Sequence, residues 1–112
     1  MSRSETSVNN NKKIVLITGA TGFIGRALSL YFHRRGYSVR GLARNCKDAD
    51  LSRLNIQLYK CDLPDILDKE AFKNADVVIH CAYATQNAKR DDAIQVNMAG
   101  TEKVYHASQN SS

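Results

Sequence analysis

The chain has 112 residues, of which 43% are hydrophobic and 24% are charged, and this size suits one globular domain with one core. Its apolar runs fall short of the roughly 20 residues that span a bilayer, and its polar start lacks the apolar segment of a secretory signal. The formal charge of +5 comes from scattered lysines and arginines, without the basic, aromatic-rich run typical of nucleic-acid-binding proteins. We therefore expect a cytoplasmic domain over residues 12–109 that binds neither membranes nor nucleic acid, with a disordered tail over residues 1–11 and a short C-terminal tail over residues 110–112.

The first predicted elements are a strand, a helix and a second strand. Lys13–Thr18 (KIVLIT) is short, continuous and β-branched, as expected of a strand buried on both faces. A helical pattern runs from Gly22 to Arg35, and Gly36 is placed to end it. The predicted apolar stripe of this helix consists of Ile24, Leu28 and Tyr31, with Ala27 beside them. Ser38–Ala43 is the second predicted strand.

A turn then leads to the third strand and the second helix. Ile56–Cys61 (IQLYKC) has the composition of a strand. Asp65–Asn74 is predicted to be a helix, because Pro64 is tolerated in a first helical turn. Its apolar anchors are Ile66, Leu67 and Phe72.

The last predicted elements are a strand, a polar loop and a long helix. Asp76–Cys81 (DVVIHC) is the fourth strand, Tyr83–Lys89 the loop and Asp91–Gln109 the helix. One face of that helix is predicted to consist of Ile94, Met98, Thr101 and Tyr105. Strands that alternate with helices indicate an α/β fold, here a Rossmann-like doubly wound parallel sheet truncated after about four strands.

The three cysteines, Cys46, Cys61 and Cys81, form no CxxC pair and are odd in number. Neither a zinc site nor a disulfide framework is predicted, and no metal site is expected. Cys61 and Cys81 lie in apolar strand-like runs, where a free cysteine behaves as a small hydrophobic residue.

The most informative motif joins the first strand to the first helix. Thr18–Gly25 reads TGATGFIG, with glycines at Gly19, Gly22 and Gly25. One glycine turns the chain, one lets the backbone approach a pyrophosphate, and one lets the helix pack closely on the strand. A Walker loop is the competing interpretation, but its second glycine would fall on Ile24 and its Lys-Ser/Thr pair is missing.

Four segments together resemble the extended short-chain dehydrogenases/reductases, the NAD(P)-dependent epimerase/dehydratase family. Besides the glycine motif they are Cys61–Leu63, Asp76–Ala82 and Val96–Thr101 (VNMAGT), in the family's order. The resemblance implies a dinucleotide cofactor held by the glycine motif, by an aspartate-leucine pair at the adenine and by the end of the fourth strand at the nicotinamide ribose. The implied cofactor-binding residues are Gly19, Thr21, Gly22, Phe23, Ile24, Gly25, Asp62, Leu63, Ala82, Tyr83 and Asn97.

Three of these polar residues have alternative interpretations. Asp62 could instead cap the helix that follows it. His80, on an apolar strand, fits a hydrogen-bonded core histidine better than a catalytic one. Asn97 is unfavourable inside a helix, so it is either exposed or recruited to hold the fourth-strand loop, and we favour the second.

The end of the second strand bears on the choice between NADP and NAD. An acidic residue there would hydrogen-bond the ribose 2′-hydroxyl and favour NAD. Ala43 occupies that position and Arg44 follows, and a guanidinium can grip a 2′-phosphate at two points. This pattern resembles NADP-dependent members such as the flavonoid reductases. NADP is therefore the preferred cofactor, with a solvated surface role for Arg44 as the alternative.

The family's catalytic tyrosine has a lysine four residues later, and none of the five tyrosines of this chain has one. We therefore expect no catalytic residue here, weak cofactor binding and no turnover by this segment alone. The first hypothesis is that the chain is part of an oxidoreductase, epimerase or dehydratase. Its small-molecule substrate carries a hydroxyl or carbonyl, such as a nucleotide sugar. The alternatives are a non-catalytic NADP-binding sensor and a degenerate remnant, and a homo-oligomer stays open.

Overall fold

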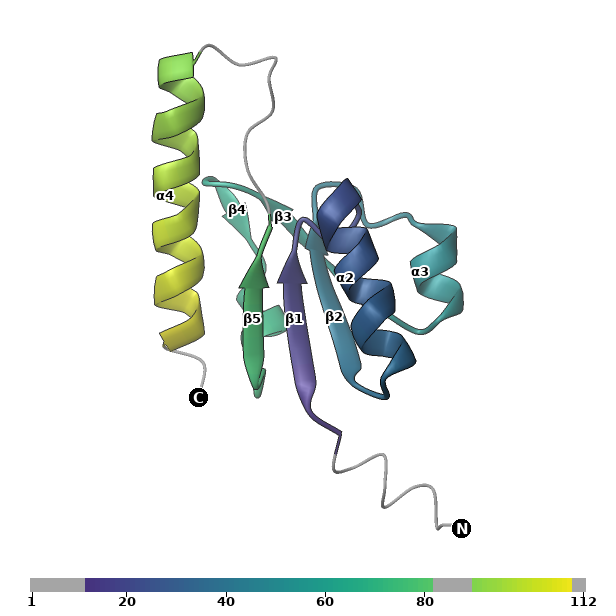
Figure 1. Cartoon of the computed structure of the whole chain (residues 1–112). Helices are drawn as coiled ribbons and strands as arrows, with labels where there is room; N and C mark the ends of the chain where they lie inside the picture. The colour runs from purple at the N-terminus through teal and green to yellow at the C-terminus, as the bar shows by residue number, and fades with distance from the viewer. Residues whose placement is uncertain (1–11, 82–89, 110–112) are drawn as a thin grey trace, which may run out of the picture.

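The computed structural model describes residues 12–81 and 90–109, with side chains described for residues 12–81 and 97–109. Figure 1 shows a sheet with helices on both of its faces. In chain order the elements are β1 (Ile14–Thr18), α2 (Phe23–Arg34), β2 (Ser38–Ala43), α3 (Ala49–Arg53), β3 (Gln57–Asp62), β4 (Ile66–Leu67), the 3₁₀ helix η1 (Lys69–Phe72), β5 (Val77–His80) and α4 (Arg90–Gln109).

The sheet has five strands in the order β4-β3-β2-β1-β5. Strands β3, β2, β1 and β5 are parallel, and only the two-residue β4 pairs antiparallel, with β3. The predicted α/β, Rossmann-like class is therefore confirmed. The chain leaves β1 toward β2 on one side, whereas β5 returns to pair on the other side of β1. In such sheets ligands bind at this reversal, beyond the carboxyl ends of the strands.

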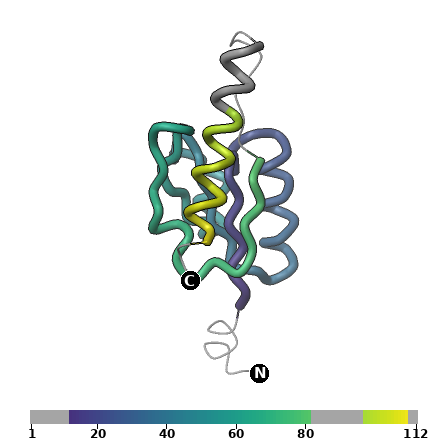
Figure 2. The backbone as a smooth tube through the Cα atoms, turned by 90° about the vertical axis from the view of Figure 1, so that its left-hand side faces the viewer, coloured from purple at the N-terminus to yellow at the C-terminus, as the bar shows by residue number. Residues whose placement is uncertain are grey.

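Two cores cover the two faces of the sheet. On one face α2 and α3 enclose a cluster that includes Val15, Ile17 and Leu51. On the other face α4 and η1 enclose a cluster that includes Leu16 and Phe72. Figure 2 views the molecule from the α4 side, with the sheet between α4 and α2. Because neighbouring residues of β1 enter opposite cores, its continuous apolar sequence is explained.

The helix predicted over Asp65–Asn74 is wrong. Its first residues instead form β4, whose Ile66 pairs with Asp62 of β3, so they cannot take helical dihedrals. Only η1 is helical, capped by the side chain of Asp68, which accepts from the backbone N–H of Glu70. The anchor role of Phe72 is confirmed, since its side chain is fully buried.

The turn predicted between the second and third strands contains a helix, α3, that the sequence analysis missed. Asp48 is its N-cap and accepts from the backbone N–H of Leu51 at 3.1 Å. Leu51 is fully buried in the core beneath α2 and α3. Because α3 is so short and buries only one residue, it has no repeating apolar pattern from which the sequence could predict a helix.

The predicted apolar face of α2 is only partly right. Leu28 packs against the core, but Ile24 and Tyr31 are largely exposed, as is Ala27. The buried positions are Gly25 and Ser29, and Ser29 is accommodated because its hydroxyl donates to the carbonyl of Gly25 at 2.7 Å. Close packing at the glycine bend thus rotates the helix away from the apolar stripe.

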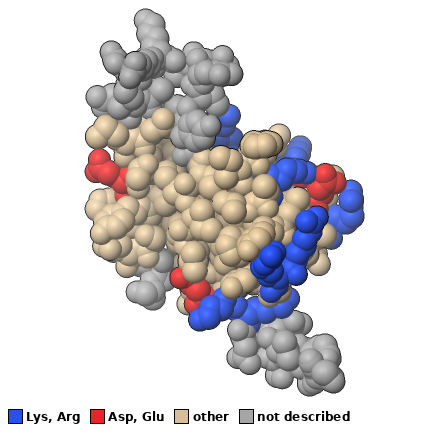
Figure 3. Space-filling view, viewed as in Figure 1, with Lys and Arg blue, Asp and Glu red and all other residues tan. Residues whose placement is uncertain are grey.

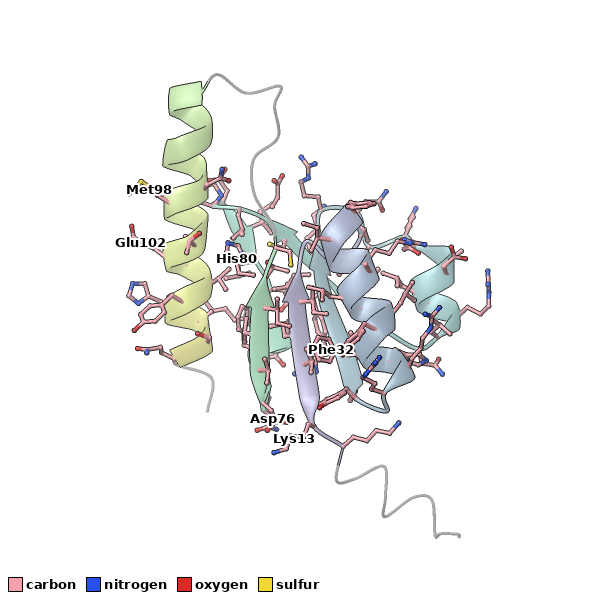
Figure 4. The ribbon with its side chains drawn as sticks, in the orientation of Figure 1. Lys13, Phe32, Asp76, His80, Met98 and Glu102 are labelled. Atoms are coloured by element: carbon pink, nitrogen blue, oxygen red, sulfur yellow. The ribbon has the colours of Figure 1, made fainter. Side chains whose placement is uncertain are left out.

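The predicted face of α4 is wrong for the residues whose side chains are described. Met98, Thr101 and Tyr105 are exposed, and Figure 4 shows Met98 pointing away from the sheet. The inward face consists of Gly100, Val104 and Ala107. The small residues allow α4 to approach the sheet, so size rather than hydrophobicity selects the buried face. The side chain of Ile94, the predicted tails and the predicted loop over residues 83–89 lie outside the described residues.

All three cysteines are free, as expected. Cys61 is buried in the core under α4, and this burial raises the pKa of its thiol to about 11. Cys81 packs at the edge of the other core, where burial also raises its pKa. Both are therefore protonated, weakly reactive thiols near neutral pH.

Candidate functional site

The bend between β1 and α2 is built by the backbone. Gly19 has a φ of +67°, a conformation that side chains strongly disfavour. The N–H of Ala20 donates to the carbonyl of Leu42 on β2 at 3.1 Å, and the N–H of Gly22 donates to the carbonyl of Gly19 at 3.0 Å. The bend is therefore fixed to the sheet and to itself.

Gly25 lets the first turn of α2 lie directly against this bend. A Cβ at Gly25 would stand 2.0 Å from the carbonyl oxygen of Gly19, which is far inside contact distance. At Gly22 a Cβ would meet the same oxygen at 3.4 Å, which is ordinary contact. Gly25 is thus required by packing between helix and strand, whereas the protein itself leaves room for a side chain at Gly22.

The start of α2 is suited to an anion. Within the described residues its N-cap, Gly22, provides no side-chain cap, and the first turn holds no acidic residue. Phe23 and Ile24 are 94% and 56% exposed, and Thr21 beside them is partly exposed. The first N–H groups of the helix and the positive end of its dipole therefore face outward from the bend, an arrangement that favours a phosphate.

The carboxyl ends of β1 and β5 are tied together beside this bend. The hydroxyl of Thr18, which is buried, accepts from the backbone N–H of Cys81 at 2.8 Å and lies 2.7 Å from Nδ1 of His80. Figure 4 shows His80 between β5 and α4. Burial lowers the pKa of His80, so the imidazole is neutral near pH 7 and Nδ1 can accept from the hydroxyl. His80 has the structural hydrogen bond that its sequence context favours.

Arg44 lies directly after β2, at the same edge of the sheet, and its side chain is exposed. No partner for its guanidinium is found in residues 12–81 or 97–109. Arg26 of α2, by contrast, is paired with Asp48 and donates to Asp50 at 2.8 Å. The Arg26 guanidinium also holds the pKa of Asp48 below its usual value. Within the described residues, Arg44 is therefore a cation of this loop without an ionic partner, as is the exposed Lys47, whereas Arg26 has a structural role.

The basic side chains are unevenly distributed. In the view of Figure 3 they gather on the side of α2 and α3 and below it, whereas few charges lie over the middle of this face. The loop that carries Arg44 belongs to the α3 side.

The predicted adenine pair has two different environments. Asp62, the last residue of β3, is exposed at the carboxyl edge, and its carbonyl accepts from the backbone N–H of Asp65 at 3.0 Å. The capping alternative for Asp62 is wrong, because β4 rather than a helix follows it. Leu63 is partly buried, and a Cβ on Gly100 of α4 would lie 3.1 Å from its Cβ. Leu63 thus packs against α4 at Gly100.

The remaining predicted residues are less fully described. Asn97 is partly buried on α4, three residues before Gly100 and on the same inward side. Ala82 and Tyr83, together with the loop that Asn97 is predicted to hold, lie outside the described residues. The glycine bend, Arg44 and Asp62 do share the carboxyl edge of the parallel strands.

A sequence profile of the NAD-dependent epimerase/dehydratase family matches residues 15–112, nearly the whole chain. The chain belongs to this family. The resemblance that the four motifs indicate is thereby confirmed.

Three similar proteins show the range of relatives. Cinnamoyl-CoA reductase 1 of Oryza sativa subsp. japonica is 33% identical over 117 residues, covering 95% of this chain and 34% of that protein. An NADPH-dependent 1-acyldihydroxyacetone phosphate reductase of Schizosaccharomyces pombe is 43% identical over 56 residues, covering 48% of this chain and 19% of that protein. A crystal structure of a short-chain dehydrogenase/reductase superfamily protein from Agrobacterium tumefaciens with bound NAD superposes with a TM-score of 0.69 and 26% identity, covering 85% of this chain and 28% of that chain.

The chain thus spans about a third of the length of the first of these relatives. None of the helices within residues 12–81 and 90–109 has the length and hydrophobicity of a membrane-spanning segment. The same residues bring no three His, Cys, Asp or Glu side chains together in a group that could hold a metal ion.

Sequence reasoning missed two parts of the site. One is the Arg26 pair with Asp48, which joins α2 to α3 across 22 positions of sequence. The spacing Asp48-x-x-Leu51 was the available signal, since an N-cap aspartate before a buried leucine marks a helix start. The other is the Thr18–His80 hydrogen bond, for which strand register was needed.

Proposed function

We propose that this chain binds NADP in preference to NAD, with the pyrophosphate at the bend from Gly19 to Gly25 and the 2′-phosphate at Arg44. The observation that carries the proposal is the exposed, uncommitted guanidinium directly after β2, where no acidic residue competes for the ribose. A guanidinium offers a planar fork that matches two phosphate oxygens. The fission-yeast relative described as NADPH-dependent supports the same choice.

The test compares affinities for the two cofactors in the wild type and in Arg44→Ala. Hydrogen bonds to charged groups contribute about 1.5–3 kcal/mol, so Arg44→Ala should weaken NADP binding by roughly 10- to 100-fold. NAD binding should change little. Arg34→Ala is the matched control, since Arg34 is an exposed arginine at the opposite end of α2. Equal affinities of the wild type for NADP and NAD would refute the proposal.

We also propose that the whole protein uses this cofactor in redox chemistry on a hydroxyl or carbonyl substrate, such as a nucleotide sugar. Membership of the family supports an NAD(P)-dependent oxidoreductase, epimerase or dehydratase. The named reductase from rice supports carbonyl reduction among these activities. We propose a cytoplasmic location for it, and fractionation of the native protein tests that expectation.

For the 112 residues by themselves we propose cofactor binding without turnover, because the tyrosine-lysine pair is not among them. Hydride transfer is followed as the change in NADPH absorbance with a panel of aldehydes, acyl thioesters and nucleotide sugars. A rate above background would contradict this part of the proposal. The sensor alternative predicts that the whole protein lacks the pair, so the complete coding sequence discriminates the two hypotheses.

A further inference from the structure

The loop after β2 is fixed at its first residue by a lysine on the neighbouring strand. Lys60 of β3 lies opposite Ala43, the last residue of β2 and the last pair of the β2–β3 ladder. The Nζ of Lys60 donates to the carbonyl oxygen of Arg44, the first residue beyond that ladder. A side chain thus contacts the first carbonyl oxygen beyond the ladder.

The far end of the same loop is fixed independently. Asp48 pairs with Arg26 of α2 and also caps α3. Between the two fixed ends, the backbone N–H of Lys47 donates to the Asn45 side chain at 2.9 Å. Arg44 therefore lies on a short segment whose ends are both bound to the fold, and its guanidinium has no partner within residues 12–81 or 97–109.

We infer that Lys60 is a positioning residue for recognition of the 2′-phosphate and acts through the backbone of Arg44. The inference rests on the proposed function, in which Arg44 grips that phosphate. A bidentate contact loses strength when the guanidinium is misplaced, because both hydrogen bonds depend on direction. Without Lys60, the Arg44 carbonyl is left to water and the residue samples other orientations.

Two other basic residues, Arg26 and Lys60, lie at the ends of this loop and are candidates for direct contact with the phosphate. Arg26 is disfavoured as a second phosphate ligand, because two carboxylates already neutralise its charge. Lys60 is engaged with a carbonyl, although its ammonium group has further hydrogens to donate. A direct contact between Lys60 and the phosphate is therefore the rival explanation that the experiment has to separate.

The experiment titrates the 112-residue chain with 2′,5′-ADP and with 5′-AMP, followed by NMR shifts of the labelled protein. The first ligand carries the 2′-phosphate and the second lacks it. Lys60→Met should weaken 2′,5′-ADP binding by about 3- to 10-fold, the loss of one well-placed hydrogen bond, and leave 5′-AMP unchanged. Lys60→Arg, which keeps a donor, should restore most of the loss. Lys103→Met makes the same charge change on an exposed residue of α4 and should have no effect.

The double variant with Arg44→Ala separates the mechanisms. If Lys60 acts through Arg44, Lys60→Met has no further effect once Arg44 is alanine. An undiminished effect in that background means direct phosphate contact and overturns the inference. Equal weakening of both ligands indicates a merely structural role and also overturns it. If the wild type prefers 2′,5′-ADP and loses this preference in Arg44→Ala but not in Lys60→Met, the inference is overturned and the proposed function stands. If the wild type binds 2′,5′-ADP and 5′-AMP with equal affinity, the proposed function is overturned as well.

Discussion

The contact between Gly25 and the glycine bend gives a sharp test of how this site is built. A Cβ at Gly25 would stand 2.0 Å from the carbonyl oxygen of Gly19, 2.7 Å from its carbonyl carbon and 3.0 Å from Cα of Ala20. All three are backbone atoms, so no side-chain rotation relieves the overlap. Carbon–oxygen contacts ordinarily begin at about 3.3 Å, so Gly25→Ala must move the start of α2 by more than about 1 Å.

The cost follows from two opposing effects. Alanine gains about 1 kcal/mol over glycine in a helix interior, whereas forcing a methyl group into close packing costs about 1–3 kcal/mol and occasionally more. Because the clash here is with backbone, we expect the upper end and a net loss of about 2 kcal/mol. For a domain of this size that loss lowers the melting temperature by roughly 10 °C.

Gly22→Ala is the matched variant. Its Cβ would meet the same oxygen at 3.4 Å, and its φ of −79° suits any residue. Its melting temperature should stay close to wild type. Its methyl group would stand where we propose that the pyrophosphate approaches the first amides of α2, so NADP affinity should fall about tenfold or more. Circular dichroism melts and NADP titrations of both variants measure the two effects. A Gly25→Ala protein that melts like the wild type would refute the packing argument, and a Gly22→Ala protein that keeps its affinity would refute the pyrophosphate position.

Three further predictions concern the sheet and its second core. Gly100→Ala should cost less than Gly25→Ala in thermal melts, because its Cβ meets the Leu63 side chain at 3.1 Å and not backbone; an equal cost contradicts this reasoning. Phe72→Ala should lower the free energy of unfolding in urea by about 3–5 kcal/mol, since a fully buried ring leaves a cavity, and a loss below about 1 kcal/mol would show that the core collapses around it. Burial depresses the folded-state pKa of His80, so unfolding takes up a proton as pH falls below about 6.5. Wild-type stability should therefore decline more between pH 7.5 and 5.5 than that of His80→Gln, and parallel declines would exclude the linkage.

The sequence predicts the parallel strands well, because their signal is local. Lys13–Thr18 and Ser38–Ala43 match β1 and β2 within one residue. The continuous, largely β-branched run of β1 before Gly19 has few alternatives, and β2 follows closely on Gly36 at the end of the first helix. The helix predicted over Asp65–Asn74 fails for the opposite reason. Its Ile66 and Leu67 are apolar at positions that suit a helix, but pairing with β3 decides their conformation, and that pairing is not visible in local sequence.

The buried faces of the two long helices were mispredicted for a single physical reason. Hydrophobicity selects Ile24 and Tyr31 on α2 and Met98 on α4, and all three are about half exposed or more. The structure buries Gly25 on α2 and Gly100 on α4, where small size lets the backbone approach its neighbour. An apolar periodicity does not count glycine as a buried residue, so it does not predict a helix face that packs through glycine. For α2 the glycine motif therefore predicts the buried face better than the apolar stripe does.

Two kinds of interaction build the two ends of the candidate site. The bend at Gly19 to Gly25 depends on main-chain hydrogen bonds and on the absence of side chains, so it can recognise only what all dinucleotides share. The loop at Arg44 depends on side chains, with Lys60 and Arg26 holding its ends from β3 and α2. Within the described residues, the side chains of Arg44 to Lys47 make no hydrogen bond to the bend, and only Asp48 reaches the start of α2, through Arg26. Cofactor choice can therefore change at Arg44 while pyrophosphate binding is kept. The Arg44→Ala chain should therefore still bind NAD, and loss of both cofactors together would mean that the loop supports the bend after all.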